Sequence, residues 1–229
     1  MTGEGGMTRG RETIGGRIRV MVISRGSGIY PELLSQVKGC PDNLYCLGEE
    51  GLLKEAMIAV VGCRDISFYG ERVIKKLVPQ LVRRGLVIVS GMAFGVDAMV
   101  HEACIQSGGK TIAVLASGPD MPTPKGNTWI YKKILDNGGL IVSEKAFGQH
   151  PTREDFLKRN RIVAGMSQGV LVVEGKCRSG SMVTAKIALD LGRDVWAVPG
   201  RIDEANSWTP NYLIKNGAGL VTEAEDLGI

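Results

Sequence analysis

Aromatic residues, histidines and long hydrophobic runs are all scarce in this sequence. Aromatics make up 5% of the 229 residues while 32 are glycines, a balance that favours a fold with many tight strand–helix turns over an all-β sandwich. No apolar run approaches the ~18 residues of a membrane-spanning helix, and no signal-peptide pattern is present. We therefore expect a cytoplasmic protein that does not associate with the membrane.

Metal and disulfide chemistry have little support. The five cysteines are scattered and odd in number, no two have C-x-x-C spacing, and His101 and His150 are the only histidines. Structural zinc sites need Cys and His at short, regular spacing, and disulfide frameworks need an even set of cysteines. We expect no metal, no cofactor and no disulfide framework.

Common nucleotide-enzyme motifs are absent as well. There is no G-x-x-x-x-G-K-[ST] sequence, and Gly91 and Gly95 lack the G-x-G-x-x-G spacing of a dinucleotide fingerprint. No Ser/His/Asp or Cys/His arrangement stands out. His101, four residues after Asp97, is interpreted as a structural histidine. The sequence therefore predicts a protein without a catalytic centre.

The chain is only mildly basic overall, but its charged residues are unevenly distributed. The net charge is +4, which permits nucleic acid as a partner without requiring it. Residues 153–201 hold nine Lys or Arg against five Asp or Glu, whereas residues 203–229 hold one Lys against five acids. A basic face with an acidic tail is one interpretation, and an ordinary solvated surface is the other.

Apolar strands alternate with amphipathic helices along most of the chain. Strands are predicted at residues 57–61, 86–89, 111–115, 140–143, 170–173 and 195–198, and helices at about 69–84, 97–106, 129–136, 153–166 and 181–191. Asp97 is the expected N-cap of its helix. Such alternation predicts an α/β fold, a mostly parallel sheet with helices on both faces.

The remaining segments are patterned more weakly. Residues 1–27 are expected to be disordered or a short lead-in with one strand at 18–23, and residues 28–56 a lead-in packed on the core, with a helix at 30–37 and a strand at 44–47. Residues 57–229 are expected to form the main domain, which ends in a short helix at 210–216, a strand at 220–221 and a helical turn at 223–227.

The stretch from Phe156 to Ala185 combines two features that suit an anionic ligand. A turn at residues 178–181, between an apolar strand and a helix, leaves backbone N–H groups at the positive end of the helix dipole. Upstream lies the basic run Lys158-Arg159-Asn160-Arg161, in which Lys158 and Arg161 share a helix face. Phe156 can either stack on a base beside these cations or fill the core. Ligands of parallel sheets bind at the carboxyl ends of strands, where this turn and Gly62-Cys63-Arg64 both fall. The first interpretation is a phosphate-backbone or nucleotide site.

Several segments in register resemble the DNA-processing protein A (DprA/Smf) family. They include IAVVGCR (58–64), VIVSGMAFGVDAMVHEACIQSGGKTIAVLASG (87–118), FLKRNRIVAG (156–165), RSGSMVTAKIALDLGRDVWAVPG (178–200) and NYLIKNGA (211–218). The resemblance covers about residues 28–229. Departures from the family pattern at Cys63, Phe94, Thr123-Pro124 and Trp208-Thr209-Pro210-Asn211 concern the rim of the expected pocket.

The resemblance implies an extended Rossmann-like fold that binds single-stranded DNA without catalysis. It further implies protection of incoming DNA, help in loading the RecA recombinase during DNA uptake and recombination, and a homodimer. The residues it places at the nucleic acid or its phosphates are Arg64, Gly91, Phe156, Lys158, Arg159, Asn160, Arg161, Ser179, Gly180, Ser181 and Thr184.

Two alternatives stay open. The turn at residues 178–181, called the anion turn below, would equally serve a nucleotide-sensing module without a DNA role. A second alternative is a nucleoside monophosphate phosphoribohydrolase of the lysine-decarboxylase-like (LOG) group, whose turn carries a catalytic Glu. In this sequence Thr184 stands where that Glu would be, which argues against hydrolysis.

Overall fold

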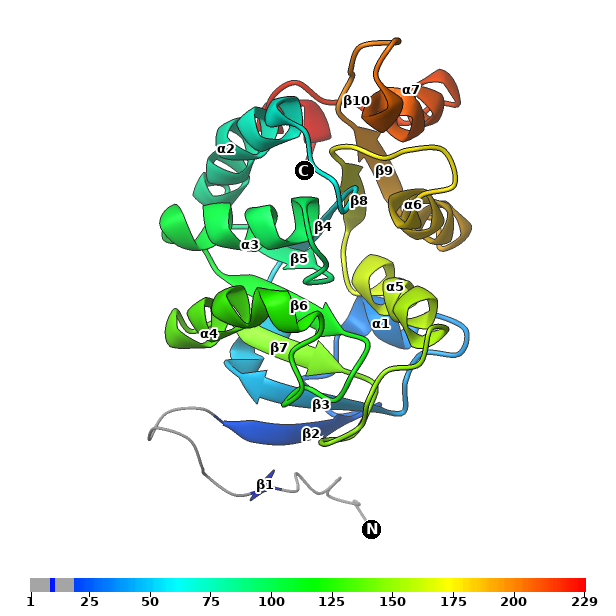
Figure 1. Ribbon diagram of the computed structural model, residues 1–229. Coiled ribbons are helices and arrows are strands. Elements are labelled where there is room, and N and C mark those ends of the chain that lie inside the picture. Colours follow the sequence, from blue (N-terminus) through cyan, green and yellow to red (C-terminus); the bar gives the residue numbers. More distant parts are fainter. Residues whose placement is uncertain (1–8, 11–18) are drawn as a thin grey trace.

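The computed structural model describes residues 9–10 and 19–229. Their strands form one ten-stranded sheet in the order β1-β2-β3-β7-β6-β5-β4-β8-β9-β10 (Figure 1). The strands are β1 (Arg9–Gly10), β2 (Val20–Ser24), β3 (Asn43–Gly48), β4 (Met57–Val61), β5 (Val87–Ser90), β6 (Thr111–Leu115), β7 (Leu140–Ser143), β8 (Gly169–Val172), β9 (Asp194–Ala197) and β10 (Gly219–Leu220).

The sheet is parallel from β7 to β10, whereas β1, β2 and β3 are antiparallel. The predicted α/β class with a mostly parallel sheet is thus confirmed. Every residue of β4 to β8 is buried, because helices cover both faces, and this explains the continuous apolar runs in the sequence. The antiparallel edge was not predicted.

The helices begin and end within two residues of their predicted positions. They are α1 (Glu32–Ser35), α2 (Phe68–Arg83), α3 (Val96–Gln106), α4 (Thr128–Asp136), α5 (Asp155–Gly165), α6 (Gly180–Asp190) and α7 (Trp208–Lys215), with 3-10 turns η1 (Glu50–Lys54), η2 (Lys125–Asn127), η3 (Ala205–Ser207) and η4 (Ala224–Leu227). Of the turns, only η4 was predicted as helical.

The helices form two layers. Helices α2, α3 and α4 cover one face of the sheet, and α1, α5 and α6 cover the other (Figure 1). Successive residues of β4 point to opposite faces: Ala59 packs in the core with α5 and α6, whereas Ile58 packs with α2 and α3. Each amphipathic helix therefore buries its apolar stripe against one face of the same sheet.

The start of α3 differs from the prediction. Its N-cap is Gly95, which has a positive φ of 73°, and Asp97 lies inside the first turn, where its carboxylate accepts a hydrogen bond from the N–H of Ala93 (3.2 Å). A side chain at position 95 would overlap the carbonyl of Cys63. The close approach of this turn to the loop after β4 explains why a glycine, and not Asp97, occupies the cap.

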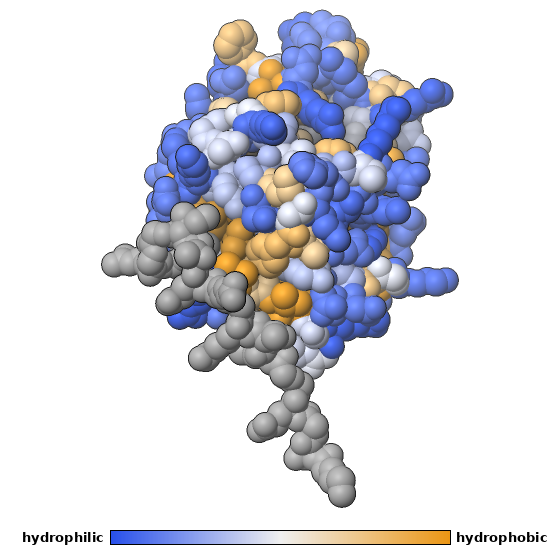
Figure 2. Space-filling view, turned by 60° about the horizontal axis from the view of Figure 1, so that its bottom comes forward, coloured by the Kyte–Doolittle hydropathy of each residue, from blue (hydrophilic) through white to orange (hydrophobic). Residues whose placement is uncertain are grey.

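The lead-in residues 28–56 contribute β3 and α1 to the same sheet and core, with Leu34 and Leu44 fully buried there. Much of the segment expected to be disordered or a lead-in (1–27) lies outside the described residues, and its described part forms β1 and β2. Figure 2 looks onto the part of the molecule at the bottom of Figure 1 and shows apolar residues gathered within a mostly hydrophilic surface. Among the described residues, no helix combines the length and apolarity that crossing a membrane requires.

Candidate nucleic-acid interface

The strand order reverses at β4. The chain adds β5, β6 and β7 on one side of β4, then returns through α5 to place β8 and β9 on the other side. Ligands of open α/β sheets bind at such a switch point, outside the carboxyl ends of the strands. A cavity of about 530 Å³ lies there, lined by residues that follow β4, β5 and β8 and by helices α5 and α6.

Most of the sequence-predicted site residues line this cavity. They are Arg64, Gly91, Phe156, Arg159, Asn160, Ser179, Gly180, Ser181 and Thr184. Asp97, Leu157, Lys176, Cys177 and Arg178 line it too, although sequence reasoning did not select them. Lys176 stands two residues before the turn at 178–181 and Arg178 lies within it, and these positions could have identified both residues from the sequence.

The anion turn forms the N-terminus of α6. Ser179 is the N-cap, and its hydroxyl accepts a hydrogen bond from the N–H of Met182 (3.3 Å) and contacts the hydroxyl of Ser181 (2.8 Å). The N–H groups of Gly180 and Ser181 have no partner among the described residues, as expected in a first helical turn. Because these donors lie at the positive end of the helix dipole, the turn can bind a phosphate.

Arg64 is an exposed cation on the loop after β4, without an ion-pair partner among the described residues. The loop is held by the buried carboxylate of Glu174, which accepts hydrogen bonds from the N–H (3.0 Å) and the hydroxyl of Ser67. Asn206 adds a hydrogen bond to the carbonyl of Asp65 (2.8 Å). Arg64 is thus a free charge on a fixed backbone.

Cys63 is not available as a nucleophile, although it lines the cavity. Its thiol is buried and contacts a carboxylate oxygen of Glu174 (3.5 Å). Burial and the negative charge of Glu174 raise the pKa of Cys63 to about 12. The thiol therefore stays protonated near neutral pH.

Arg159 does not project freely into the cavity. It is 8% exposed, and one of its terminal nitrogens donates hydrogen bonds to the carbonyls of Gly91 and Val114 (2.5 Å to Val114). These carbonyls stand at the carboxyl ends of β5 and β6. Burial lowers the pKa of Arg159 while the nearby Asp97 opposes that effect, and burial raises the pKa of Asp97. Arg159 therefore forms part of the cavity wall and braces two strand ends.

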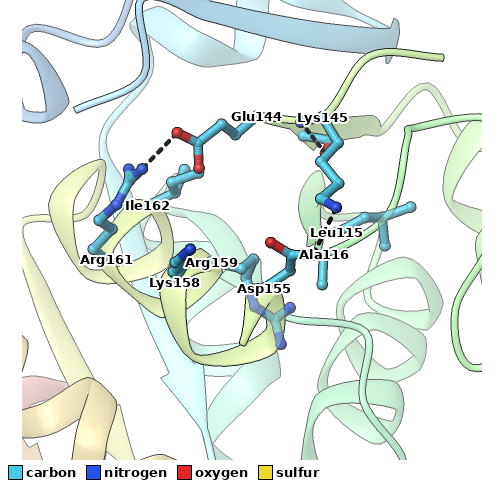
Figure 3. A pocket seen from close by; sticks show the side chains of 10 residues that line it. Leu115, Ala116, Glu144, Lys145, Asp155, Lys158, Arg159, Arg161 and Ile162 are labelled. Atoms are coloured by element: carbon cyan, nitrogen blue, oxygen red, sulfur yellow. Dashed lines mark hydrogen bonds and ion pairs between the residues drawn. The ribbon is translucent and has the colours of Figure 1, made fainter. Parts of the chain in front are cut away.

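Lys158 and Arg161 line a different cavity, of about 500 Å³, beside the ends of β6 and β7 (Figure 3). Their predicted shared helix face is confirmed, but helix α5 presents them to this second cavity and not to the first. Arg161 pairs with Glu144 (2.6 Å) and Lys158 with Glu154 (3.4 Å). Arg159 lines both cavities. The basic run is therefore split between two sides of α5.

His101 is buried outside the cavity. Its Nδ1 lies 2.7 Å from the hydroxyl of Thr111, which itself donates to the carbonyl of Ile88 (2.7 Å). Because that hydroxyl has one hydrogen to donate, Nδ1 of His101 carries the proton and donates it. Burial, together with the charge of Arg159, lowers the pKa of His101 to about 3. The imidazole is therefore neutral and plays a structural role.

The described residues contain no cluster of three His, Cys, Asp or Glu side chains placed to hold a metal ion. The site can instead supply cations, helix N–H groups and a half-buried aromatic ring, Phe156.

Several known proteins are similar to this chain, and three of them are described here. The protein Smf of Escherichia coli is 42% identical over 206 residues, which cover 90% of this chain and 55% of Smf. The solved structure of DNA processing protein A from Streptococcus pneumoniae matches at a TM-score of 0.86 and 41% identity, covering 91% of this chain and 73% of that one. The chain thus spans only about half the length of Smf.

The third is a structure of DNA processing protein A from Helicobacter pylori, described in connection with the single-stranded DNA binding mode of that protein. It matches at a TM-score of 0.79 and 30% identity, covering 86% of this chain and 90% of that one. The model of the DNA recombination-mediator protein A family matches residues 21–228. This chain therefore belongs to the DNA recombination-mediator protein A family, as its motifs had indicated.

Proposed function

We propose that this chain binds single-stranded DNA at the cavity between the ends of β4, β5 and β8. The observation that carries the proposal is the meeting of three elements there: the free cation Arg64, the half-buried ring of Phe156, and the N-terminus of α6 with its unpaired N–H groups. A cation and a helix N-terminus suit phosphate, and an aromatic ring suits an unpaired base.

Arg64 and the Ser179–Ser181 turn contact the phosphate backbone in this proposal, and Phe156 contacts a base. Arg159 supports the wall, and Lys158 and Arg161 reach the strand only where it crosses α5. Membership of the DNA recombination-mediator protein A family supports the same ligand, as does the similarity to the Helicobacter pylori protein with its single-stranded DNA binding mode. The wider role, in DNA uptake and recombination with loading of RecA by a cytoplasmic homodimer, is proposed on the same grounds.

The chain acts as a binding protein without catalysis in this proposal. The buried carboxylates of Glu174 and Asp97 are already engaged: Glu174 accepts from Ser67, and Asp97 accepts from Ala93. Thr184, which stands where the LOG group has its catalytic Glu, donates its hydroxyl hydrogen to the carbonyl of Gly180 (3.1 Å). Asp65, an exposed carboxylate that lines the cavity, pairs with Lys176 (3.1 Å), so each of these three carboxylates has a partner within the chain.

A nucleotide-sensing function is the second candidate, because a cavity of about 530 Å³ has the size of a small-ligand site. A titration of labelled oligo-dT at two salt concentrations, with duplex DNA and AMP as competitors, separates the two. Single-strand binding that weakens steeply with salt and resists AMP is expected, because phosphate contacts release counterions. Binding or hydrolysis of AMP without binding of oligo-dT would overturn the proposal.

A further inference from the structure

Two exposed aromatic rings form a parallel stack on α7. The ring centroids of Trp208 and Tyr212 are 5.0 Å apart and their planes differ by 7°, an offset-stacked geometry. The residues are one helical turn apart and are 43% and 44% exposed. Large aromatic side chains left this exposed, and already aligned, present a flat apolar surface on which a further ring can stack.

The stack begins directly beside the anion turn. The segment carrying Trp208 is bonded to the loop after β8 by two backbone hydrogen bonds, from Gly175 N–H to the carbonyl of Asn206 (2.6 Å) and from Thr209 N–H to the carbonyl of Gly175 (2.8 Å). The hydroxyl of Thr209, the next residue after Trp208, lies 3.1 Å from the hydroxyl of Ser179. The N-terminus of α7 and the N-terminus of α6 are therefore joined through side chains as well as backbone.

Thr209 also ties the stack to the cationic part of the loop. Its hydroxyl donates to the carbonyl of Lys176 (2.7 Å), and Lys176 and Arg178 both have exposed side chains that line the main cavity. Aromatic faces next to a cationic groove are the combination that binds single-stranded nucleic acid, in which phosphates and bases alternate along the chain.

We propose that the Trp208–Tyr212 stack is a base-stacking subsite that receives a nucleobase adjacent to the phosphate held at the N-terminus of α6. The inference rests on the proposed single-stranded DNA binding and adds a subsite on the α7 side of the cavity, away from Phe156 on α5. A base there becomes the third ring of a stack that Trp208 and Tyr212 have already aligned, so little ordering of the protein is needed.

The test compares oligo-dT with an abasic strand of equal length for four proteins: wild type, Trp208→Ala, Trp208→Phe and Trp129→Ala. Trp129 is a matched control because it is also 43% exposed but lies on α4. We expect Trp208→Ala to bind oligo-dT about tenfold more weakly, the effect of losing one stacked base. Its affinity for the abasic strand should be unchanged, Trp208→Phe should retain most of the affinity, and Trp129→Ala should match wild type.

Fluorescence supplies an independent readout. In a Trp129→Phe background the remaining tryptophans are Trp208 and the buried Trp196, so quenching on addition of oligo-dT reports mainly on Trp208. Quenching by oligo-dT but not by the abasic strand is expected.

The outcomes separate the subsite from the proposed function. If wild type binds oligo-dT and Trp208→Ala binds it equally well without loss of base preference, the subsite is wrong and the proposed function stands. If Trp208→Ala changes only the sedimentation of the protein, the stack is an interface between copies, which also overturns the inference. If wild type binds no oligo-dT at all, both fall.

Discussion

The guanidinium of Arg159 lies directly against the backbone of Gly91, and a Cβ on residue 91 would occupy the same space. Arg159 on α5 thereby reaches across the carboxyl end of β5 to the carbonyl of Val114 on β6. The contact joins the helix that carries the basic run to two strands of the parallel sheet, and it requires glycine at position 91 because no side chain fits beneath the guanidinium.

Substitution Gly91→Ala should therefore displace Arg159. We expect the free energy of unfolding to fall by about 1–3 kcal/mol, the range for overpacking a filled site, and the affinity for oligo-dT to fall with it. Gly180→Ala is the matched control for stability alone, because a Cβ at Gly180 meets nothing within 4 Å. Urea unfolding of both variants checks the prediction, and equal stabilities would contradict it.

Arg64→Ala should weaken DNA binding without affecting the fold. Arg64 is exposed and has no ion-pair partner among the described residues, so its removal should leave the unfolding transition unchanged. The affinity should fall equally for all DNA sequences, and the slope of log affinity against log salt concentration should decrease by about one. Arg83→Ala, an exposed arginine in the last turn of α2, is the control. Salt titrations with oligo-dT and a mixed-sequence strand measure both quantities, and an unchanged slope would place the phosphate elsewhere.

Glu174→Gln should act on DNA binding through Arg64. One acceptor oxygen of the buried carboxylate is replaced by an NH₂ group that faces the donors of Ser67, so we expect a loss of about 1–3 kcal/mol in stability and a weaker affinity. In an Arg64→Ala background, Glu174→Gln should cause little further loss of DNA affinity. Glu55→Gln, at an exposed position, is the control and should change neither stability nor affinity. Additive losses in the double variant would show that Glu174 acts independently of Arg64.

His101 should make stability depend on pH. Its pKa is about 3 in the folded protein against about 6.5 when unfolded, so below pH 6.5 the unfolded chain takes up a proton that the folded one does not. The contribution of neutral His101 to the free energy of unfolding is therefore complete above pH 6.5 and is lost as the pH falls towards 3.

Between pH 7.5 and 5 wild type should therefore lose about 2 kcal/mol more stability than His101→Asn, whose amide can still donate to Thr111. Urea unfolding at pH 7.5, 6 and 5 measures this difference. Parallel stability curves would mean that His101 titrates normally.

The order of strands and helices could be predicted from the sequence because each element carries a local signal. Fully apolar runs such as residues 57–61 follow from burial on both faces of a sheet, and the stripe on α2 follows from the helical period. The anion turn at residues 178–181 was also predicted, since a strand, a Gly/Ser turn and a helix lie in succession along the chain.

The tertiary structure alone decided how the site is divided. The basic run 158–161 looks continuous in the sequence, yet the turn of α5 sends Lys158 and Arg161 to one cavity and buries Arg159 against Gly91. Three further features depend on segments far apart in the chain: the pairing of β3 with β7, the hydrogen bonds of Glu174 to the Arg64 loop, and the contact of Thr209 with Ser179. Local patterns determine which residues form helices and strands, whereas long-range packing determines which charges stay free to meet a ligand.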